Sequence, residues 1–239
     1  MTLSFIHHTP MIFEVRDLWP ESAVALGEII SSKAFELATK LEEACYRRAK
    51  AIVVVTQGIL NRLIERNIPA HKLAFIPNGA NVDLFQFRAE GRKQIRTALG
   101  LGDKFVAIYA GIHGVAQGLE TVIETAQKLR NDPEIHFLMV GDGPKKGEIV
   151  ELASQYRLPN LTFLPEQPKE LISNYLSAAD VALIPLRNLN LFKSALPSKV
   201  FDAWACQCPI ILSVDGEARS VLEQAEGGLF VPQKMPLRW

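Results

Sequence analysis

Short apolar segments alternate with amphipathic segments along most of the chain, and this alternation limits the fold more than any other feature. Phe105–Ala110 is an apolar run with β-branched members, and residues 119–129 then carry apolar side chains at helical spacing. Short strands that are apolar throughout are typical of parallel sheets covered by helices on both faces. The sequence therefore predicts an α/β fold built on a doubly wound parallel sheet of Rossmann type. Further strand-like runs follow at 135–140, 161–164, 181–185 and 210–214, with helical stretches at 145–156, 169–178 and 198–206.

The same alternation indicates how the chain divides into domains. It begins near residue 50, where strand-like residues 51–55 and 73–76 flank a helical stretch at 59–66. Before it lie a strand-like stub and a helix that ends at Arg48, and the last residues stop without a closing helix. We therefore predict a remnant of a second domain with its linking helix at 1–49, the main domain at 50–232 and a truncated tail at 233–239.

The composition excludes several classes of function. The 239 residues include 26 basic and 26 acidic side chains, so a zero net charge offers no electrostatic basis for binding nucleic acid or an anionic membrane. No apolar run approaches the roughly 18–20 residues that span a bilayer, and the N-terminus lacks the pattern of a secretion signal. Three cysteines without a C-x-x-C pair favour a reducing cytoplasm. Because the five histidines show no ligand spacing either, we expect a cytoplasmic protein without a metal site.

A glycine-rich loop, from Gly111 to Gly118, joins the strand at 105–110 to the following helix. Ligands of doubly wound sheets bind beyond the carboxyl ends of the strands. The glycines let a ligand approach the main chain, and the free amides of a helix N-terminus attract an anion. The loop is equally consistent with a tight turn that needs glycine for its conformation alone, so the glycines leave phosphate binding open.

Two further turns carry weaker signals. In the turn at 141–144, Asp142 fits a helix cap at least as well as a ligand contact, and Pro144 fits the first turn of a helix. Asn78-Gly79 is a turn dipeptide after a strand, and by itself it predicts little more than that turn.

The segment 195–205 carries the most informative charge pattern. Pro197-Ser198 marks the start of a helix, with Ser198 as a candidate cap, and Lys199 follows in the first turn. A cation there is unfavourable against the helix dipole unless an anion shares the site. Asp202 lies three residues further on, on the same side of the helix. The alternative to an anion site is a surface ion pair between Lys199 and Asp202.

Taken together, these motifs resemble the carboxyl-terminal, donor-binding domain of GT-B retaining glycosyltransferases of family four, the group 1 glycosyl transferases. The resemblance covers the chain from about residue 10 to residue 232 and points to the subgroup of O-antigen and capsule assembly, fucosamine-transferase-like members included. The initial VRDLWPES resembles the last part of that subgroup's amino-terminal domain. The segments that carry the remaining resemblance are IPNGANVDLF, VGDGPKKGEIVELA, LSAADVALIPL and ALPSKVFDAWACQCPII.

The resemblance implies a nucleotide-sugar donor, expected to be UDP-linked, with no metal ion or other cofactor. It makes Lys199 and Asp202 the catalytic residues: Lys199 neutralises charge on the leaving phosphate, and Asp202 hydrogen-bonds the ribose hydroxyls. The glycine loop then binds the diphosphate through main-chain amides, and the turn after residue 164 holds the base. The donor contacts implied in this way are Gly111, His113, Gly114, Gln117, Gly118, Asn78, Gly79, Gly141, Pro165, Glu166 and Ser198.

The chain departs from the family pattern at several positions. Ile112 and Gln117 stand where the family commonly has arginine or lysine, so the glycine loop lacks two usual phosphate cations. Ser194 stands where the family commonly has a second glutamate, and the acceptor domain of an intact member is largely missing. Since the remaining stub is too small for a core of its own, we expect Ile12, Leu18 and Trp19 to be partly exposed.

Two hypotheses about function follow. In the first, the chain is the donor half of a glycosyltransferase of envelope polysaccharide synthesis that acts on a sugar or lipid-linked acceptor, with a separate acceptor domain and no nucleic acid. Such an enzyme is expected in the cytoplasm, with peripheral binding at the inner face of the membrane as an open alternative. In the second, it is a truncated nucleotide-binding remnant or partner subunit without catalysis of its own. A Rossmann-type epimerase or dehydrogenase is disfavoured because no G-x-G-x-x-G opens a βαβ unit near the N-terminus.

Overall fold

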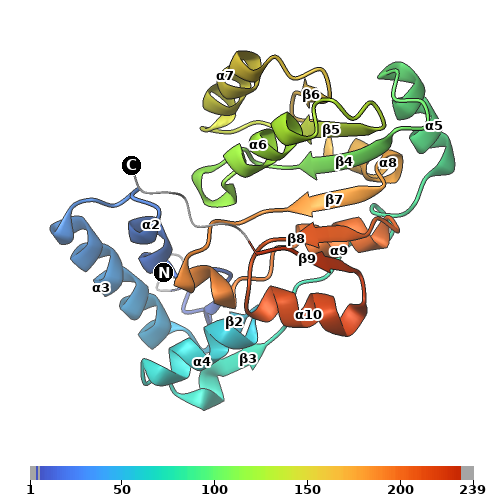
Figure 1. Cartoon of the computed structure of the whole chain (residues 1–239). Coiled ribbons are helices and arrows are strands. Elements are labelled where there is room, and N and C mark those ends of the chain that lie inside the picture. The colour runs from blue at the N-terminus through green and yellow to red at the C-terminus, as the bar shows by residue number, and fades with distance from the viewer. Residues whose placement is uncertain (1–3, 5, 233–239) are drawn as a thin grey trace. The chain divides into compact units, whose positions relative to one another are not determined.

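The computed structural model describes residue 4 and residues 6–232. The chain divides into two compact units, each with a parallel sheet of its own (Figure 1). The smaller unit comprises the chain up to Asn78 together with the segments Leu189–Leu196 and Gly216–Ala218, and the larger unit contains the rest. Within the described residues, no helix is long and apolar enough to cross a membrane.

The larger unit is built on a six-stranded sheet in which every neighbouring pair of strands is parallel. The order across the sheet is β6-β5-β4-β7-β8-β9. This arrangement confirms the predicted doubly wound α/β fold. The strands are β4 (Phe105–Ala110), β5 (Ile135–Val140), β6 (Leu161–Leu164), β7 (Val181–Ile184), β8 (Ile210–Leu212) and β9 (Gly228–Phe230).

Helices follow these strands and bury both faces of the sheet. Tyr109 of β4 and Met139 of β5 are buried on the face that packs against two of the helices, α6 and α7. Because side chains alternate along a strand, Ile108 and Leu138 point to the opposite face, and both have no exposed surface. The helical segments are α5 (Ala89–Ala98), η2 (Val115–Gln117), α6 (Glu120–Lys128), α7 (Lys146–Tyr156), η3 (Lys169–Leu171), α8 (Ile172–Ala178), α9 (Lys199–Ala205) and α10 (Glu217–Ala225), of which η2 and η3 are 3-10 helices.

The strand order places a topological switch point between β4 and β7. The chain runs outward from β4 through β5 to β6, and then returns to place β7 on the other side of β4. The loops that follow β4 and β7 meet directly, because the Arg187 amide donates to the carbonyl of Ala116 at 2.8 Å. The carboxyl ends of strands at a switch point are where doubly wound sheets bind ligands.

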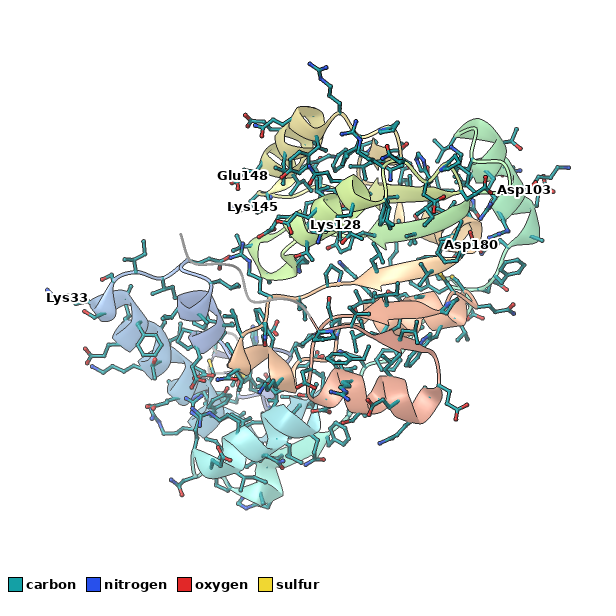
Figure 2. The ribbon with its side chains drawn as sticks, viewed as in Figure 1. Lys33, Asp103, Lys128, Lys145, Glu148 and Asp180 are labelled. Atoms are coloured by element: carbon teal, nitrogen blue, oxygen red, sulfur yellow. The ribbon has the colours of Figure 1, made fainter. Side chains whose placement is uncertain are left out.

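The helix α5 has no counterpart among the expected elements, and long-range polar contacts hold it. Arg92 and Arg96 donate to the two carboxylate oxygens of Asp180, at 2.8 and 2.6 Å, and the Val106 amide donates to the same carboxylate at 2.8 Å. Burial disfavours the Asp180 carboxylate, but the hydrogen bonds and the two guanidinium charges outweigh burial and hold its pKa below the usual value. Asp180 thus joins α5 to the start of β4 (Figure 2).

The smaller unit contains a three-stranded parallel sheet in the order β1-β2-β3. Its core includes Ile52, Val54 and Leu63, none of which has any exposed surface. Its elements are β1 (Ile12–Val15), α2 (Glu21–Ala25), α3 (Ser32–Arg48), β2 (Ala51–Val54), α4 (Gln57–Glu65), η1 (Ala70–Lys72), β3 (Leu73–Phe75) and η4 (Asn190–Ser194).

The division of the chain differs from the boundary expected between residues 49 and 50. Both β2 and β3 pair with β1 and not with the six-stranded sheet. A strand–helix–strand alternation shows that strands are parallel, but it looks the same in either sheet and so does not show which sheet they join. Trp19 is exposed as predicted, whereas the expected exposure of Leu18 is wrong because Leu18 is buried in the core of the smaller unit. The tail expected at 233–239 lies outside the described residues.

Candidate functional site

The loops after β4 and β5 are joined along their main chains at the carboxyl end of the larger sheet. The Gly111 amide donates to the carbonyl of Val140 at 2.8 Å, and the His113 amide donates to the carbonyl of Asp142 at 2.7 Å. The His113 carbonyl in turn accepts from the amide of Lys145 at 2.8 Å. The predicted residues Gly111, His113 and Gly141 are therefore brought together on neighbouring loops.

The close approach of these loops explains why glycine is needed at two positions of the turn at 141–144. A Cβ at Gly141 would collide with the carbonyl oxygen of Gly111, and a Cβ at Gly143 would collide with the main chain of His113. Both glycines also have positive φ angles, +139° and +152°. The turn at 141–144 thus needs glycine for its packing, whether or not a ligand binds there.

Some amides of the glycine loop are already used within the protein. Those of Gly111 and His113 bond to β5 and its loop, as described above. Among the described residues, no acceptor is found for the amides of Ile112 and Gly114. The predicted contact between loop and diphosphate is therefore open to these two amides, and at Gly111 and His113 it competes with existing hydrogen bonds.

Lys199, the first residue of α9, places its ammonium group against the start of the glycine loop. Its Nζ donates to Tyr109 Oη at 2.7 Å and lies 4.3 Å from the centroid of the Tyr109 ring. A Cβ at Gly111 would collide with Nζ and Cε of Lys199. Burial lowers the pKa of Lys199 to about 8, although the Asp202 carboxylate acts in the opposite direction. The site thus holds a cation at the carboxyl end of β4, at a helix N-terminus that disfavours it.

Tyr109 extends this contact into the glycine loop. Its Oη donates to the carbonyl of Ile112 at 2.5 Å, so its lone pairs are free to accept from Lys199. Burial raises the pKa of Tyr109 above its usual value, so the phenol stays neutral. Tyr109 was predicted only as a strand residue, although its hydroxyl near the end of an otherwise apolar run was an available signal.

His113 lies inside the larger unit and has no exposed surface. Its ring is 5.6 Å from that of Tyr109, and within the described residues neither ring nitrogen has a hydrogen-bond partner. Burial lowers the pKa of His113 to about 4; Lys146 and Lys199 lower it further, and Asp142 opposes them. The structure therefore places His113 in the core as a neutral side chain, and its contact with a donor stays a prediction.

Asp202 lies one turn after Lys199 on α9 and is partly buried. Burial raises its pKa, against the effect of the Lys169 and Lys199 cations. Ser198 occupies the N-cap position, but its side chain makes no capping hydrogen bond, so the expected capping role is wrong. A cap requires an extended main chain at that residue, and Ser198 is already helical (φ −59°, ψ −26°).

A cavity of about 560 Å³, which we call the glycine-lined cavity, opens beside these loops. Its volume is in the range of small-molecule sites. The predicted residues Gly111, Gly141 and Glu166 line it together with Lys169, which the sequence analysis did not single out. The full lining is Gly111, Ile112, Val140, Gly141, Asp142, Gly143, Glu166, Gln167, Lys169 and Ile172.

Lys146, also missed by the sequence analysis, ties together the strand ends at this cavity. Its Nζ donates to the carbonyl of Gly141 at 2.6 Å and to that of Leu164, the last residue of β6, at 3.3 Å. It also lies 3.5 Å from a carboxylate oxygen of Asp142. The signal in the sequence was a lysine in the first turn of a helix, the same signal that pointed to Lys199.

The other predicted donor contacts lie in more varied surroundings. The side-chain oxygen of Gln117 is buried without a partner among the described residues and faces Gly114. Gly118 ends η2 with a left-handed main chain, φ +58°. The carbonyl of Pro165 accepts from Gln167 at 3.1 Å. Asn78 belongs to the smaller unit, where it accepts from Arg16 at 3.1 Å, and Gly79 opens the larger unit.

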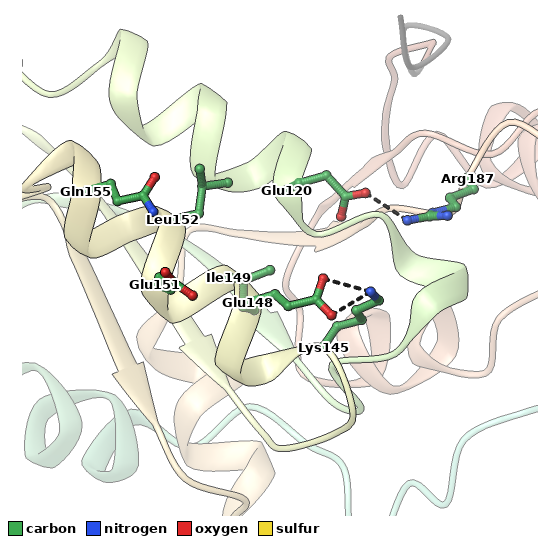
Figure 3. Close-up of a pocket in the computed structure, with 8 residues that line it drawn as sticks. All are labelled: Glu120, Lys145, Glu148, Ile149, Glu151, Leu152, Gln155 and Arg187. Atoms are coloured by element: carbon green, nitrogen blue, oxygen red, sulfur yellow. Dashed lines mark hydrogen bonds and ion pairs between the residues drawn. The ribbon is translucent and has the colours of Figure 1, made fainter. Parts of the chain in front are cut away.

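A second hollow, of about 400 Å³, lies between α6 and α7 (Figure 3). Its two cations are already paired: Lys145 with Glu148 at 2.7 Å, and Arg187 with Glu120 at 2.9 Å. Because its two cations are paired within the chain, this hollow is a poorer site for an anion than the glycine-lined cavity, where no ion pair of Lys169 is found among the described residues.

The larger unit is a doubly wound α/β unit with a cavity at the carboxyl ends of β4, β5 and β6. Comparison with known proteins identifies the family. Residues 91–237, more than half of the chain, match the family described as "Glycosyl transferases group 1", and residues 2–79 match a "Glycosyl transferase 4-like domain". The chain belongs to the group 1 glycosyl transferase family.

Two curated relatives illustrate its range. WcaI of Escherichia coli strain K12, provisionally named as a colanic acid biosynthesis glycosyl transferase, is 31% identical over 87% of this chain and 50% of WcaI. An alpha-galactosylglucosyldiacylglycerol synthase of Streptococcus pneumoniae is 28% identical over 70% of this chain and 44% of that protein. The chain spans about half the length of the curated relatives it matches.

Several solved structures share the fold. HepE of Anabaena, in complex with UDP-glucose, has a TM-score of 0.77 at 18% identity, over 98% of this chain and 61% of HepE. WaaG, a glycosyltransferase involved in lipopolysaccharide biosynthesis, has a TM-score of 0.73 at 15% identity, over 95% of this chain and 63% of WaaG. At these identities the likeness shows the fold, which is that of GT-B glycosyltransferases.

Proposed function

We infer that the larger unit binds the diphosphate of a nucleotide-sugar donor, UDP-linked, and serves as the donor half of a glycosyltransferase. The observation that carries this proposal is the Lys199 ammonium, held against Gly111 beside the glycine-lined cavity and without a carboxylate in contact among the described residues. A cation kept at a helix N-terminus needs an anion to balance it. HepE, which shares the fold, was solved with UDP and with UDP-glucose.

The proposed chemistry rests on charge that grows on the departing diphosphate. Lys199 and the open amides of the glycine loop stabilise that charge more strongly in the transition state than in the bound donor, which lowers the barrier. Asp202 accepts hydrogen bonds from the ribose hydroxyls, and the turn at Pro165 and Glu166 borders the base. These roles of the predicted site residues belong to the proposal.

The acceptor and the setting are further parts of the proposal. We place the chain in envelope polysaccharide synthesis, in the cytoplasm or at the inner face of the membrane, with a sugar or lipid-linked acceptor. The name of WcaI and the lipid named in the streptococcal relative support this setting. Membership of the fucosamine-transferase-like subgroup is proposed on the motifs alone.

The second candidate function is that of a nucleotide-binding remnant or partner subunit, which would bind the donor without catalysing transfer.

A panel of nucleoside diphosphates and nucleotide sugars, scored by thermal shift and calorimetry, tests donor binding in both cases. Ligand at about 100 times its dissociation constant adds roughly 2.7 kcal/mol to the free energy of unfolding. A panel in which no nucleoside diphosphate stabilises the chain at millimolar concentration refutes donor binding.

A further inference from the structure

A short relay of hydrogen bonds joins α9 to the glycine loop through β4. The Lys199 ammonium donates to Tyr109 Oη at 2.7 Å, and Tyr109 Oη donates to the carbonyl of Ile112 at 2.5 Å. The three residues come from segments up to 90 positions apart in the chain. Tyr109 is the middle member and contacts both of the others.

We propose that Tyr109 is a positioning residue that holds the Lys199 ammonium in its charged form at the mouth of the glycine loop, and so sets the pH range over which donor phosphate is bound. This inference rests on the proposed function, in which Lys199 contacts the diphosphate. It concerns a residue that needs no contact with the donor, because Tyr109 acts through Lys199 and through the Ile112 carbonyl.

The first argument is the shortage of other partners for the ammonium group. An ammonium group has three donors, and among the described residues Tyr109 Oη is the one hydrogen-bond acceptor found for Lys199. The face of the Tyr109 ring, 4.3 Å away, adds an attraction for the cation. Without Tyr109, a partly buried charge would lose both contacts, and burial would drive it towards the neutral amine.

The second argument is the absence of other cations in the loop itself. Residues 111–118 contain no lysine or arginine, so any full positive charge for a phosphate beside this loop comes from another element. Lys199 of α9 lies against Gly111 at the loop's first residue. Whatever fixes the Lys199 side chain therefore fixes the position of that charge.

The groups that face Lys199 do not mask its titration. His113, from the loop after β4, has its pKa lowered to about 4, and that of Tyr109 is raised, so both stay neutral between pH 7 and 9.5. Asp202 on α9 favours the ammonium, and Lys169 of η3 acts on Asp202. The remaining charged groups of this cluster, Lys146 and Asp142 on α7 and its preceding turn, face His113. The pKa of Lys199 itself, about 8, falls inside this range.

The experiment measures UDP binding by calorimetry from pH 7 to 9.5 for the wild-type chain and for Tyr109→Phe. The lower limit keeps the measurement above phosphate titration, which occurs near pH 6 for phosphoryl groups. Binding favours the ammonium, so wild-type affinity should be constant below the pKa of free Lys199 and fall about tenfold per pH unit above it. Removing the phenol oxygen should move the onset of the fall to lower pH, so that the loss of affinity is several-fold at pH 7 and grows to about tenfold to hundredfold by pH 9.5.

The matched control is Tyr156→Phe, which removes a hydroxyl at the edge of the same hydrophobic core and should change neither affinity nor pH profile. If Tyr109→Phe does not fold, Tyr109→Met fills the position with a flexible apolar side chain and carries the same expectation. If Tyr109→Phe loses affinity by the same factor at every pH, the inference is overturned, because a pH-independent loss indicates a structural role. Unchanged affinity would overturn it as well. If the wild-type chain binds no nucleoside diphosphate, the proposed function fails and this inference fails with it.

Discussion

Lys199 and Gly111 lie so close that a methyl group on Gly111 would occupy the space of the lysine's ammonium group. Gly111 also has a φ of +140°, a conformation that other residues rarely adopt. Glycine is therefore required at this position for two reasons: its main chain has a positive φ angle, and the Lys199 side chain packs directly against its Cα.

We expect Gly111→Ala to lower the free energy of unfolding by about 2 kcal/mol, because alanine is strained at this φ angle. We also expect it to weaken UDP binding, because the new Cβ displaces the Lys199 ammonium group. Gly147→Ala is the control, since Gly147 is exposed on α7 and a Cβ there meets no atom within 4 Å. That change should be neutral or stabilise by up to about 1 kcal/mol. Urea unfolding and calorimetry of both variants check the prediction, and equal stability of the two would contradict it.

Lys199→Ala should weaken nucleoside diphosphate binding by about 1.5–3 kcal/mol, because it removes a charge-assisted contact with phosphate. Lys193→Ala, which removes an exposed lysine from the smaller unit, should change the affinity much less. Calorimetric titration with UDP measures both. Wild-type affinity in the Lys199 variant would remove this residue from the donor site.

Lys146→Met should weaken UDP binding several-fold, because the lysine holds the carbonyls of Gly141 and Leu164 together at the glycine-lined cavity. The adjacent Lys145→Met breaks one ion pair with the exposed Glu148, and such surface pairs contribute about 0–1 kcal/mol. Each variant loses one positive charge, but only Lys146→Met loses the contacts with the two carbonyls. Comparing the variants by calorimetry and thermal unfolding therefore separates the effect of cavity geometry on binding from the effect of the charge. Equal affinities would show that the strand-end contact is dispensable for binding.

Stability should depend on the charge of Asp180. Its folded-state pKa is depressed, so its contribution is complete above the unfolded-state pKa and is lost as the pH falls through the folded-state pKa. Asp180→Asn should lower the free energy of unfolding by about 2 kcal/mol at neutral pH and flatten its decline in acid. Asp103→Asn changes an exposed carboxylate near the start of β4 and is the control (Figure 2). Urea unfolding from pH 7 to 3 measures the effect, and identical acid profiles would refute it.

The isolated 239-residue chain should bind a UDP-sugar but transfer no sugar. In two-domain glycosyltransferases the positioning of both substrates matters, and positioning can supply about 7–11 kcal/mol of a barrier. This chain spans about half the length of its relatives. Labelled UDP-glucose with a lipid-linked acceptor tests the expectation, with donor binding checked in the same preparation. Sustained turnover by the purified monomer would disprove it.

The sequence predicted the elements whose signal is local. The strands at 105–110, 135–140 and 161–164 were found because each is apolar throughout, and burial on both faces imposes that pattern. The helix α5 was missed because its sequence, AEGRKQIRTA, is mostly polar, and its place in the fold depends on Asp180, more than 80 residues further along. A local sequence pattern does not predict an ion pair between residues so far apart in the chain.

The same limit applied to the site. Lys199 was found because a lysine at a helix start is locally unfavourable. Tyr109 was not, because its significance lies in a hydrogen bond to a residue 90 positions away. The expected cap at Ser198 failed for a similar reason, since capping depends on main-chain angles that a serine permits but does not impose.

The strand order has a consequence for the order in which the proposed donor site is assembled during synthesis. The ribosome releases Tyr109 and the glycine loop long before β7 and α9, yet β7 must pair with β4, and α9 must follow, before Lys199 reaches the phenol. Contacts of such long sequence separation form late. A nascent chain that already contains the whole glycine loop therefore lacks the Lys199 ammonium group beside it, and under the proposed function nucleotide binding would report that the sheet is completely assembled.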